Sequence, residues 1–235
     1  MTSLPTSLVP KSLLLGAAAL AEGAVLRLLA KTVLLTLAVF VALGVAGFYG
    51  LDAALAWAGL EEGRDASALI AAVLTILGAW LLFRVVALAV LQFFADEVVV
   101  AVERRSYPAA AASARKLGLA EEAKLALGGV ARALAANLIA LPFALALLVT
   151  GIGPALVFWA VNAWLLGREL EDMAWLRHRH DSVAKSPVGG AARFMLGGIV
   201  AALLLVPLAN LLAPVLGAAA ATHLVHRRRA AANAA

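Results

Sequence analysis

Long apolar stretches alternate with short charged clusters along most of the chain. The first stretch, residues 28–51, is long enough to cross roughly 30 Å of hydrocarbon as a helix rising about 1.5 Å per residue. A second, residues 66–105, is apolar as far as Ala95 apart from Arg84, Gln92 and a few small polar residues, and is charged after that. It is longer than a bilayer requires, so its charged end is expected to project into the cytoplasm.

Residues 125–167 predict a helical hairpin. Its apolar legs cover residues 125–149 and 152–166, and Gly and Pro residues interrupt the pattern between them. These tip residues are Gly151, Gly153 and Pro154. A polar connector, expected to be helical and interfacial, precedes the hairpin at residues 108–124.

Residues 191–226 predict a second hairpin, with legs at 194–206 and 208–225. Its interrupting and polar residues are Pro207, Asn210 and Pro214. Legs of about 13 to 16 residues cover only about 20 to 24 Å, which leaves open whether each leg crosses the bilayer. Lipid cannot satisfy the backbone groups freed at Gly and Pro, so both tips are expected to be buried against other helices or to line a wet cavity.

Residues 11–22 precede the first span and combine a lysine with a short apolar run. A cleavable signal peptide is one interpretation of this segment. The run is very short, and Arg27 and Lys31 would follow the cleavage point. An amphipathic helix lying along the membrane surface is therefore favoured.

Composition supports the same picture, because 64% of the 235 residues are hydrophobic and 14% are charged. Soluble domains have roughly 45–50% and 25%. Only lipid can face that much apolar surface. The chain is expected to be a single all-α integral membrane domain, residues 1–235, and not a soluble enzyme or a nucleic-acid-binding domain.

The formal net charge of +5 comes from Lys and Arg clusters placed between apolar runs. This distribution follows the positive-inside rule and does not require a nucleic-acid partner. The loop 52–65 is acidic and is expected to lie outside. If each hairpin returns to its side of entry, the clusters 104–132, 168–193 and 227–229 all face the cytoplasm. A multi-pass protein of a bacterial inner membrane with both termini inside is expected.

Arg27 and Arg84 are candidates for binding an anion. A dianion in a membrane needs donors to replace its hydration, and an arginine supplies a charged fork. Each residue has another interpretation: Arg27 can be a snorkelling anchor, and Arg84 lies about 27 Å along the helix from Ala66, near the interface. Asn137, Asn162 and Asn210 are expected to form hydrogen bonds between helices and not to bind a ligand.

The four histidines raise the question of a metal site, since His178 is close to His180, and His223 and His226 are three residues apart. All lie in arginine-rich stretches that disfavour a cation, so no metal site is expected. The sequence has no Cys and no Walker-type, dinucleotide or HExxH motif. No cofactor and no coupling to ATP by this chain are therefore expected.

Three stretches have a recognisable order and spacing. They are Thr150-Gly-Ile-Gly-Pro154 before FWAVNAWLLGRELEDMA, Val206-Pro-Leu-Ala-Asn-Leu-Leu-Ala-Pro214 before VLGAAAATHLVHR, and Phe93-Phe-Ala-Asp-Glu97 to Tyr107-Pro108. Together they resemble the CysZ sulfate-transporter family, which shares its domain with the etoposide-induced membrane proteins. The resemblance implies a sulfate-permeable homo-oligomer with half-inserted hairpins, which supplies sulfur for cysteine synthesis.

Members of that family bind sulfate just before the first span, through a glycine, an aliphatic residue and an arginine. The matching stretch here is Val25-Leu26-Arg27, which keeps the arginine and lacks the glycine unless Gly23 replaces it. The acidic and aromatic stretch after the family's fifth helix is replaced by GRELEDMAWLRHR. This chain therefore resembles a divergent subgroup.

Permeation of sulfate or a similar anion is the function expected from the resemblance, in a lipid bilayer and with no catalytic residues. The alternative is a non-transporting scaffold or membrane-shaping protein whose hairpins wedge into one leaflet. An intramembrane enzyme is disfavoured, because the apolar segments offer almost no polar groups that could face one another.

Overall fold

Every secondary-structure element in the described part of the chain is a helix, which confirms the expected all-α membrane fold. The computed structural model describes residues 8–21, 23, 27, 30–31, 34, 37–39, 41–47, 49–50, 78, 95–179, 184–206 and 209–233. The chain divides into two compact units: residues 1–25 with 95–235, and residues 26–94. The described positions of the predicted span 28–51 are helical, whereas residues 66–77 and 79–94 of the predicted helix 66–105 lie outside the described residues.

The first unit contains the elements that carry polar interior residues. In chain order they are α1 (Leu8–Leu20), a helical segment at residues 95–106, α4 (Pro108–Ser113), α5 (Leu119–Ala146), η2 (Leu148–Thr150), α6 (Gly153–Trp175), η3 (Leu176–His178), α7 (Gly190–Leu203) and α8 (Ala209–Asn233). The expected helical connector at 108–124 is only partly helical, because residues 114–118 separate α4 from α5.

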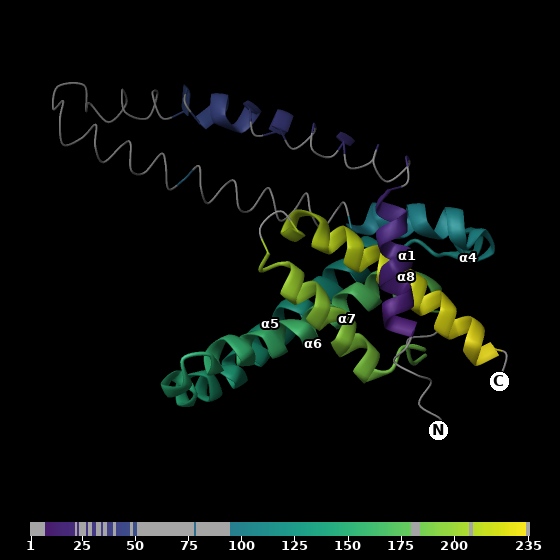
Figure 1. Cartoon of the computed structure of the whole chain (residues 1–235). Coiled ribbons are helices and arrows are strands. Elements are labelled where there is room, and N and C mark those ends of the chain that lie inside the picture. Colours follow the sequence, from purple (N-terminus) through teal and green to yellow (C-terminus); the bar gives the residue numbers. More distant parts are fainter. Residues whose placement is uncertain are drawn as a thin grey trace. The chain divides into compact units, whose positions relative to one another are not determined.

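The helices α5 and α6 pack side by side as the first predicted hairpin (Figure 1). Among the described residues, α5 is the one helix long and apolar enough to cross a membrane. Its large apolar side chains are mostly exposed, Leu134 and Leu138 among them. Such a surface suits a lipid environment.

The tip of this hairpin satisfies its own polar groups. Gly151 adopts a φ of 74°, which a residue with a side chain rarely tolerates. The Thr150 hydroxyl donates to the Leu147 carbonyl at 2.7 Å and accepts from the Gly153 N–H at 2.8 Å. The tip is exposed, with Val149 at 92%, so no described helix buries it, and the alternative that it lines a wet cavity stays a prediction.

The helices α6 and α8 both continue beyond the apolar legs that the sequence indicated. The apolar leg of α6 was expected to end at residue 166, and α8 was expected to be interrupted at Pro214. Instead α6 extends to Trp175, and α8 runs through Pro214 to Asn233. The other proline of that hairpin, Pro207, lies outside the described residues. The extensions bring charged residues and histidines onto rigid helices.

Small residues allow α6 and α7 to approach closely. A Cβ atom on Gly197 would overlap the Ala163 carbonyl, and one on Gly167 would overlap the Arg193 carbonyl. The Trp159 indole N–H donates to the Gly198 carbonyl at 3.1 Å in the same contact. Backbones at this separation fix the position of α7 on α6.

The substitution Gly197→Ala is expected to lower the free energy of unfolding by about 1–3 kcal/mol or more, since the backbones must separate to admit the methyl group. The effect is measured as the change in the thermal unfolding midpoint of the purified protein in detergent. The midpoint is determined by size-exclusion chromatography after heating. Gly129→Ala on α5 is the matched control, because its new methyl group would make only an ordinary contact with Arg132 at 3.9 Å. Equal midpoints for the two variants would contradict the prediction.

The helix α1 packs against α8 (Figure 1). It begins three residues earlier than the predicted 11–22 segment. Its buried positions are Val9, Ser12, Gly16 and Ala19, which follow one helical face. Gly16 lies against the α8 backbone, where an added Cβ would be 3.0 Å from the Ala220 nitrogen. On the opposite face Leu14 is exposed, so its apolar side chain is available to contact the membrane surface.

Candidate functional site

The two arginines predicted to bind an anion do not form a described site. Arg27 lies on helical backbone in the second unit with an exposed side chain. Arg84 lies outside the described residues. Their role in anion binding stays a prediction.

Two asparagines of the apolar legs form hydrogen bonds within their own helices. Asn137 donates to the Ala133 carbonyl and Asn162 to the Phe158 carbonyl, each at 2.8 Å and each within its own helix. A carbonyl four residues back is within reach of a helical amide, and hydrogen bonds from these two residues to another helix stay a prediction. Asn210 is exposed at the start of α8.

A polar pocket of about 340 Å³ opens where α6 ends and α7 begins, and we call it the basic pocket. Four basic side chains and two carboxylates line it: Arg168, Arg179, Lys185, Arg193, Glu171 and Asp172. With all six ionised, the lining carries a net charge of +2 (four minus two). Such a surface attracts anions.

Glu171 is the buried acid of the basic pocket, with 2% of its side chain exposed. The Arg193 guanidinium lies 3.0 Å from its Oε2 atom. The Ser186 hydroxyl donates to its Oε1 atom and accepts from the Val188 N–H at 3.0 Å. The carboxylate thus holds Arg193 in place and lies beside the Arg168 and Asp172 pair.

Burial raises the pKa of Glu171 to about 7, against the lowering effect of Arg193. The folded protein therefore binds this proton more tightly than the unfolded chain does. The free energy of unfolding is expected to fall as the pH rises from about 4.5 to 7, and this fall should be smaller in Glu171→Gln. Thermal midpoints at several pH values measure it, with exposed Glu122→Gln as control. Identical pH profiles for Glu171→Gln and the unsubstituted protein would refute it.

A second polar group lies deeper and consists of Glu103, His178 and His226, which we call the Glu103 cluster. The Oε1 atom of Glu103 is 2.7 Å from His178 Nε2 and 3.1 Å from His226 Nε2. Its Oε2 atom is 3.6 Å from the Arg177 guanidinium. The Glu103 side chain is fully buried, and the two imidazoles are 1% and 5% exposed.

Neighbouring side chains fix the position of this cluster. Tyr107 stacks on His226 with 4.4 Å between ring centroids, and its hydroxyl forms a 2.9 Å hydrogen bond with His223 Nδ1. Arg115 holds η3, because its Nε–H donates to the Leu176 carbonyl at 3.2 Å and its guanidinium pairs with Glu121. The side chains of the cluster come from three separate segments, the 95–106 helix, η3 and α8, and these contacts hold their polar atoms in fixed positions.

Burial alone would raise the pKa of Glu103, but hydrogen bonds with His178 and His226 and the charge of Arg177 lower it to about 2. The carboxylate is therefore ionised at neutral pH. An ionised and buried carboxylate contacted by several cationic or polar groups strongly constrains their positions.

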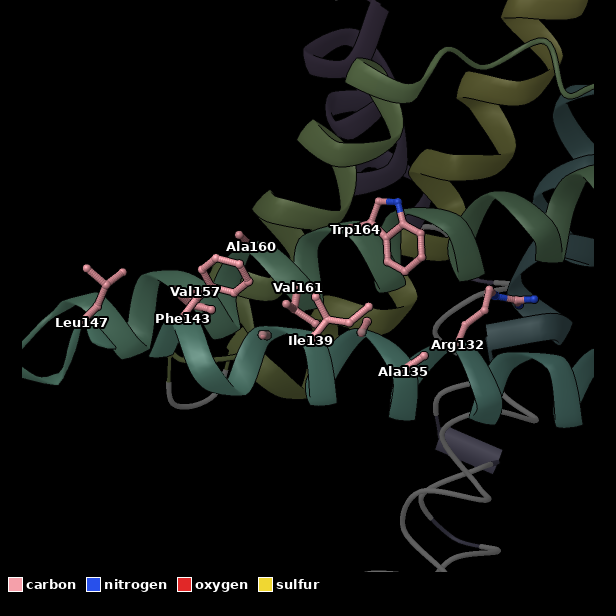
Figure 2. Close-up of a pocket in the computed structure, with 11 residues that line it drawn as sticks. Arg132, Ala135, Ile139, Phe143, Leu147, Val157, Ala160, Val161 and Trp164 are labelled. Atoms are coloured by element: carbon pink, nitrogen blue, oxygen red, sulfur yellow. The ribbon is translucent and has the colours of Figure 1, made fainter. Parts of the chain in front are cut away.

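An apolar groove of about 680 Å³ follows the contact between α5 and α6. Figure 2 shows Arg132 at one end and Leu147 at the other, with Phe143, Val161 and other apolar side chains between them. Its lining is almost entirely apolar, and among the described residues that line it Arg132 is the one charged side chain, with the Trp164 indole N–H as a further donor. The basic pocket and the Glu103 cluster are better candidates for polar chemistry.

Sequence reasoning missed both polar groups. Glu103 and Tyr107 were noted only as part of a stretch resembling the family, and Glu171 and Arg193 only as members of a charged cluster. A signal was present for Glu103, because Val98, Val99 and Val102 predict a buried helical face that continues onto it. No sequence signal paired His178 with His226.

Helical hairpins, an exposed apolar surface on α5 and closely packed small residues define an all-α membrane protein. The chain matches the model of the family described as Sulfate transporter CysZ/Etoposide-induced protein 2.4 over residues 12–214, and it belongs to that family. No curated protein and no solved structure matches the chain. The expected kinship is confirmed, and the stretch GRELEDMAWLRHR supplies the α6 half of the basic pocket.

Proposed function

We propose that this protein lets sulfate or a similar tetrahedral oxyanion permeate a bacterial inner membrane, as a homo-oligomer with both termini in the cytoplasm and without catalysing a reaction. The observation that carries the proposal is the basic pocket, in which the basic side chains outnumber the carboxylates. The name of the family, which includes a sulfate transporter, supports the same substrate class.

Geometry favours an oxyanion over other anions. Arg168, Arg179 and Arg193 each carry a planar fork of N–H donors that matches the oxygens of sulfate. Pairing with Glu171 and Asp172 keeps Arg193 and Arg168 oriented without consuming all their donors. A pocket that is partly neutralised in this way binds an anion reversibly, as permeation requires.

Uptake of radiolabelled sulfate into proteoliposomes tests the proposal. Uptake above that of protein-free vesicles is expected, with competition by unlabelled sulfate and weaker competition by chloride. Absence of uptake by protein shown to be inserted and monodisperse would overturn it. If such vesicles also became tubulated or fragmented, the result would favour a membrane-shaping protein, for which the exposed apolar surface of α5 is suited.

A further inference from the structure

We infer that Glu103, His178 and His226 form a binding site for a divalent transition-metal ion such as Zn²⁺. Each residue offers one donor atom, and these atoms lie within 4.8 Å of one another. The inference is independent of anion permeation, because no basic-pocket side chain is among the three donors.

The convergence of the three donors is the first argument. Both imidazoles direct Nε2 at the same carboxylate oxygen, at 2.7 and 3.1 Å. Zinc binds at about 2.0–2.2 Å from nitrogen and oxygen donors, so small shifts of the three side chains would bring these atoms around one ion. The donors come from the 95–106 helix, η3 and α8, so the tertiary fold brings the three ligands together.

The second argument is an unsatisfied oxygen. Glu103 Oε2 is buried and, among the described residues, has no hydrogen-bond partner; Arg177 lies beyond hydrogen-bond distance at 3.6 Å. A buried carboxylate oxygen without a partner is costly. Bidentate coordination of this carboxylate to a metal ion would give Oε2 a partner and offset that cost.

Contacts around His178 and His226 hold these side chains in place, as neighbouring residues commonly do for metal-binding histidines. Tyr107 stacks on His226 and fixes the plane of its ring. Arg115 holds the backbone of η3 on which His178 lies. Neighbours that orient ligands in this way commonly contribute to metal affinity.

The donor set decides which ions fit. Two imidazoles and one carboxylate suit zinc and neighbouring first-row metals, whereas calcium and magnesium require mostly oxygen ligands. Three protein ligands leave a coordination position open.

Arg177 opposes the binding of a cation, and this opposition supplies a sharp test. Its side chain is 24% exposed and reaches the cluster from the side that solvent can reach. Removing its charge while keeping the three ligands should tighten metal binding. If the cluster were only a structural ion-pair network, the same change would create no affinity for a metal.

The experiment uses the full chain in detergent, without a histidine tag and first treated with EDTA. Isothermal titration with Zn²⁺ and elemental analysis after gel filtration are expected to give one ion per chain. Cobalt substitution provides a second measurement, since Co²⁺ bound to imidazole nitrogen has visible absorption bands that do not depend on any transport activity. Glu103→Gln, His178→Gln and His226→Gln should each lower the affinity at least about tenfold.

Glu97→Gln is the matched control, because it removes a partly exposed carboxylate from the same helical segment as Glu103 without touching the three donors. It should keep the stoichiometry and the cobalt spectrum. Arg177→Gln should bind Zn²⁺ more tightly than the unsubstituted protein. Absence of zinc binding, or equal binding by the unsubstituted protein and His178→Gln with the same cobalt spectrum, would overturn the inference.

Discussion

Replacing Glu103 by alanine is expected to lower the free energy of unfolding by about 3–5 kcal/mol, the typical cost of removing one partner from a buried ionic group. The carboxylate is fully buried and contacts His178, His226 and Arg177. Its removal leaves a cavity and exposes the two imidazoles to each other without their shared acceptor. The thermal midpoint of the purified protein, measured with EDTA present, records the loss.

Two further variants separate the charge from the volume of Glu103. Glu103→Gln keeps the shape and one acceptor oxygen, so its loss should be smaller than that of the alanine variant. Glu97→Ala on the same helical segment removes a partly exposed carboxylate and should change the midpoint little. A midpoint for Glu103→Ala equal to that of Glu97→Ala would show that the Glu103 cluster contributes nothing to stability.

The sequence was sufficient to predict the helical fold because apolar periodicity and length are local properties. The legs at 125–149 and 152–166 and the glycines between them predicted the α5–α6 hairpin. The extension of α6 beyond its apolar leg could also have been predicted, because Arg168 to Ala174 consists mostly of strong helix formers. The charges there were interpreted as part of a cytoplasmic cluster, although charge does not end a helix outside lipid.

The polar clusters could not be predicted for a different reason. Glu103 lies 75 residues from His178 and 123 residues from His226 along the chain. Sequence proximity suggested pairing His178 with His180 and His223 with His226, yet the fold joins His178 to His226. Which buried polar groups meet depends on how α8 packs against the other helices, and periodicity contains no information about that packing.

The same reasoning explains why the arginines that were singled out differ from those in the basic pocket. Arg84 was chosen because an isolated cation in an apolar stretch is unusual, and Arg27 because it precedes the first span, where the resembling family binds sulfate. The pocket instead uses Arg168, Arg179 and Arg193, which lie in a charged region where each residue looks ordinary. Only the fold shows that Arg193 pairs with a carboxylate that is almost fully buried.

Removing the Arg193 and Glu171 pair as a unit is expected to abolish most sulfate uptake while keeping the fold. A charge-assisted hydrogen bond contributes about 1.5–3 kcal/mol, so the loss of Arg193 should weaken anion binding about 10- to 100-fold. Arg193→Gln alone also leaves Glu171 without its partner, so a fall in uptake could result from lost anion binding or from lost stability. The double variant Arg193→Gln, Glu171→Gln replaces the ion pair with two neutral amides and avoids that problem.

Uptake at several sulfate concentrations and thermal midpoints are measured for both single variants and the double variant. The double variant should have a midpoint close to that of the unsubstituted protein, yet its uptake should stay as low as that of Arg193→Gln. Lys124→Gln removes a positive charge from the exposed surface of α5 and should leave uptake unchanged. Full uptake by the double variant would contradict the prediction, because neutralising Glu171 cannot restore a contact between Arg193 and sulfate. Arg193 would then have acted only by neutralising Glu171, and the anion would have to bind elsewhere.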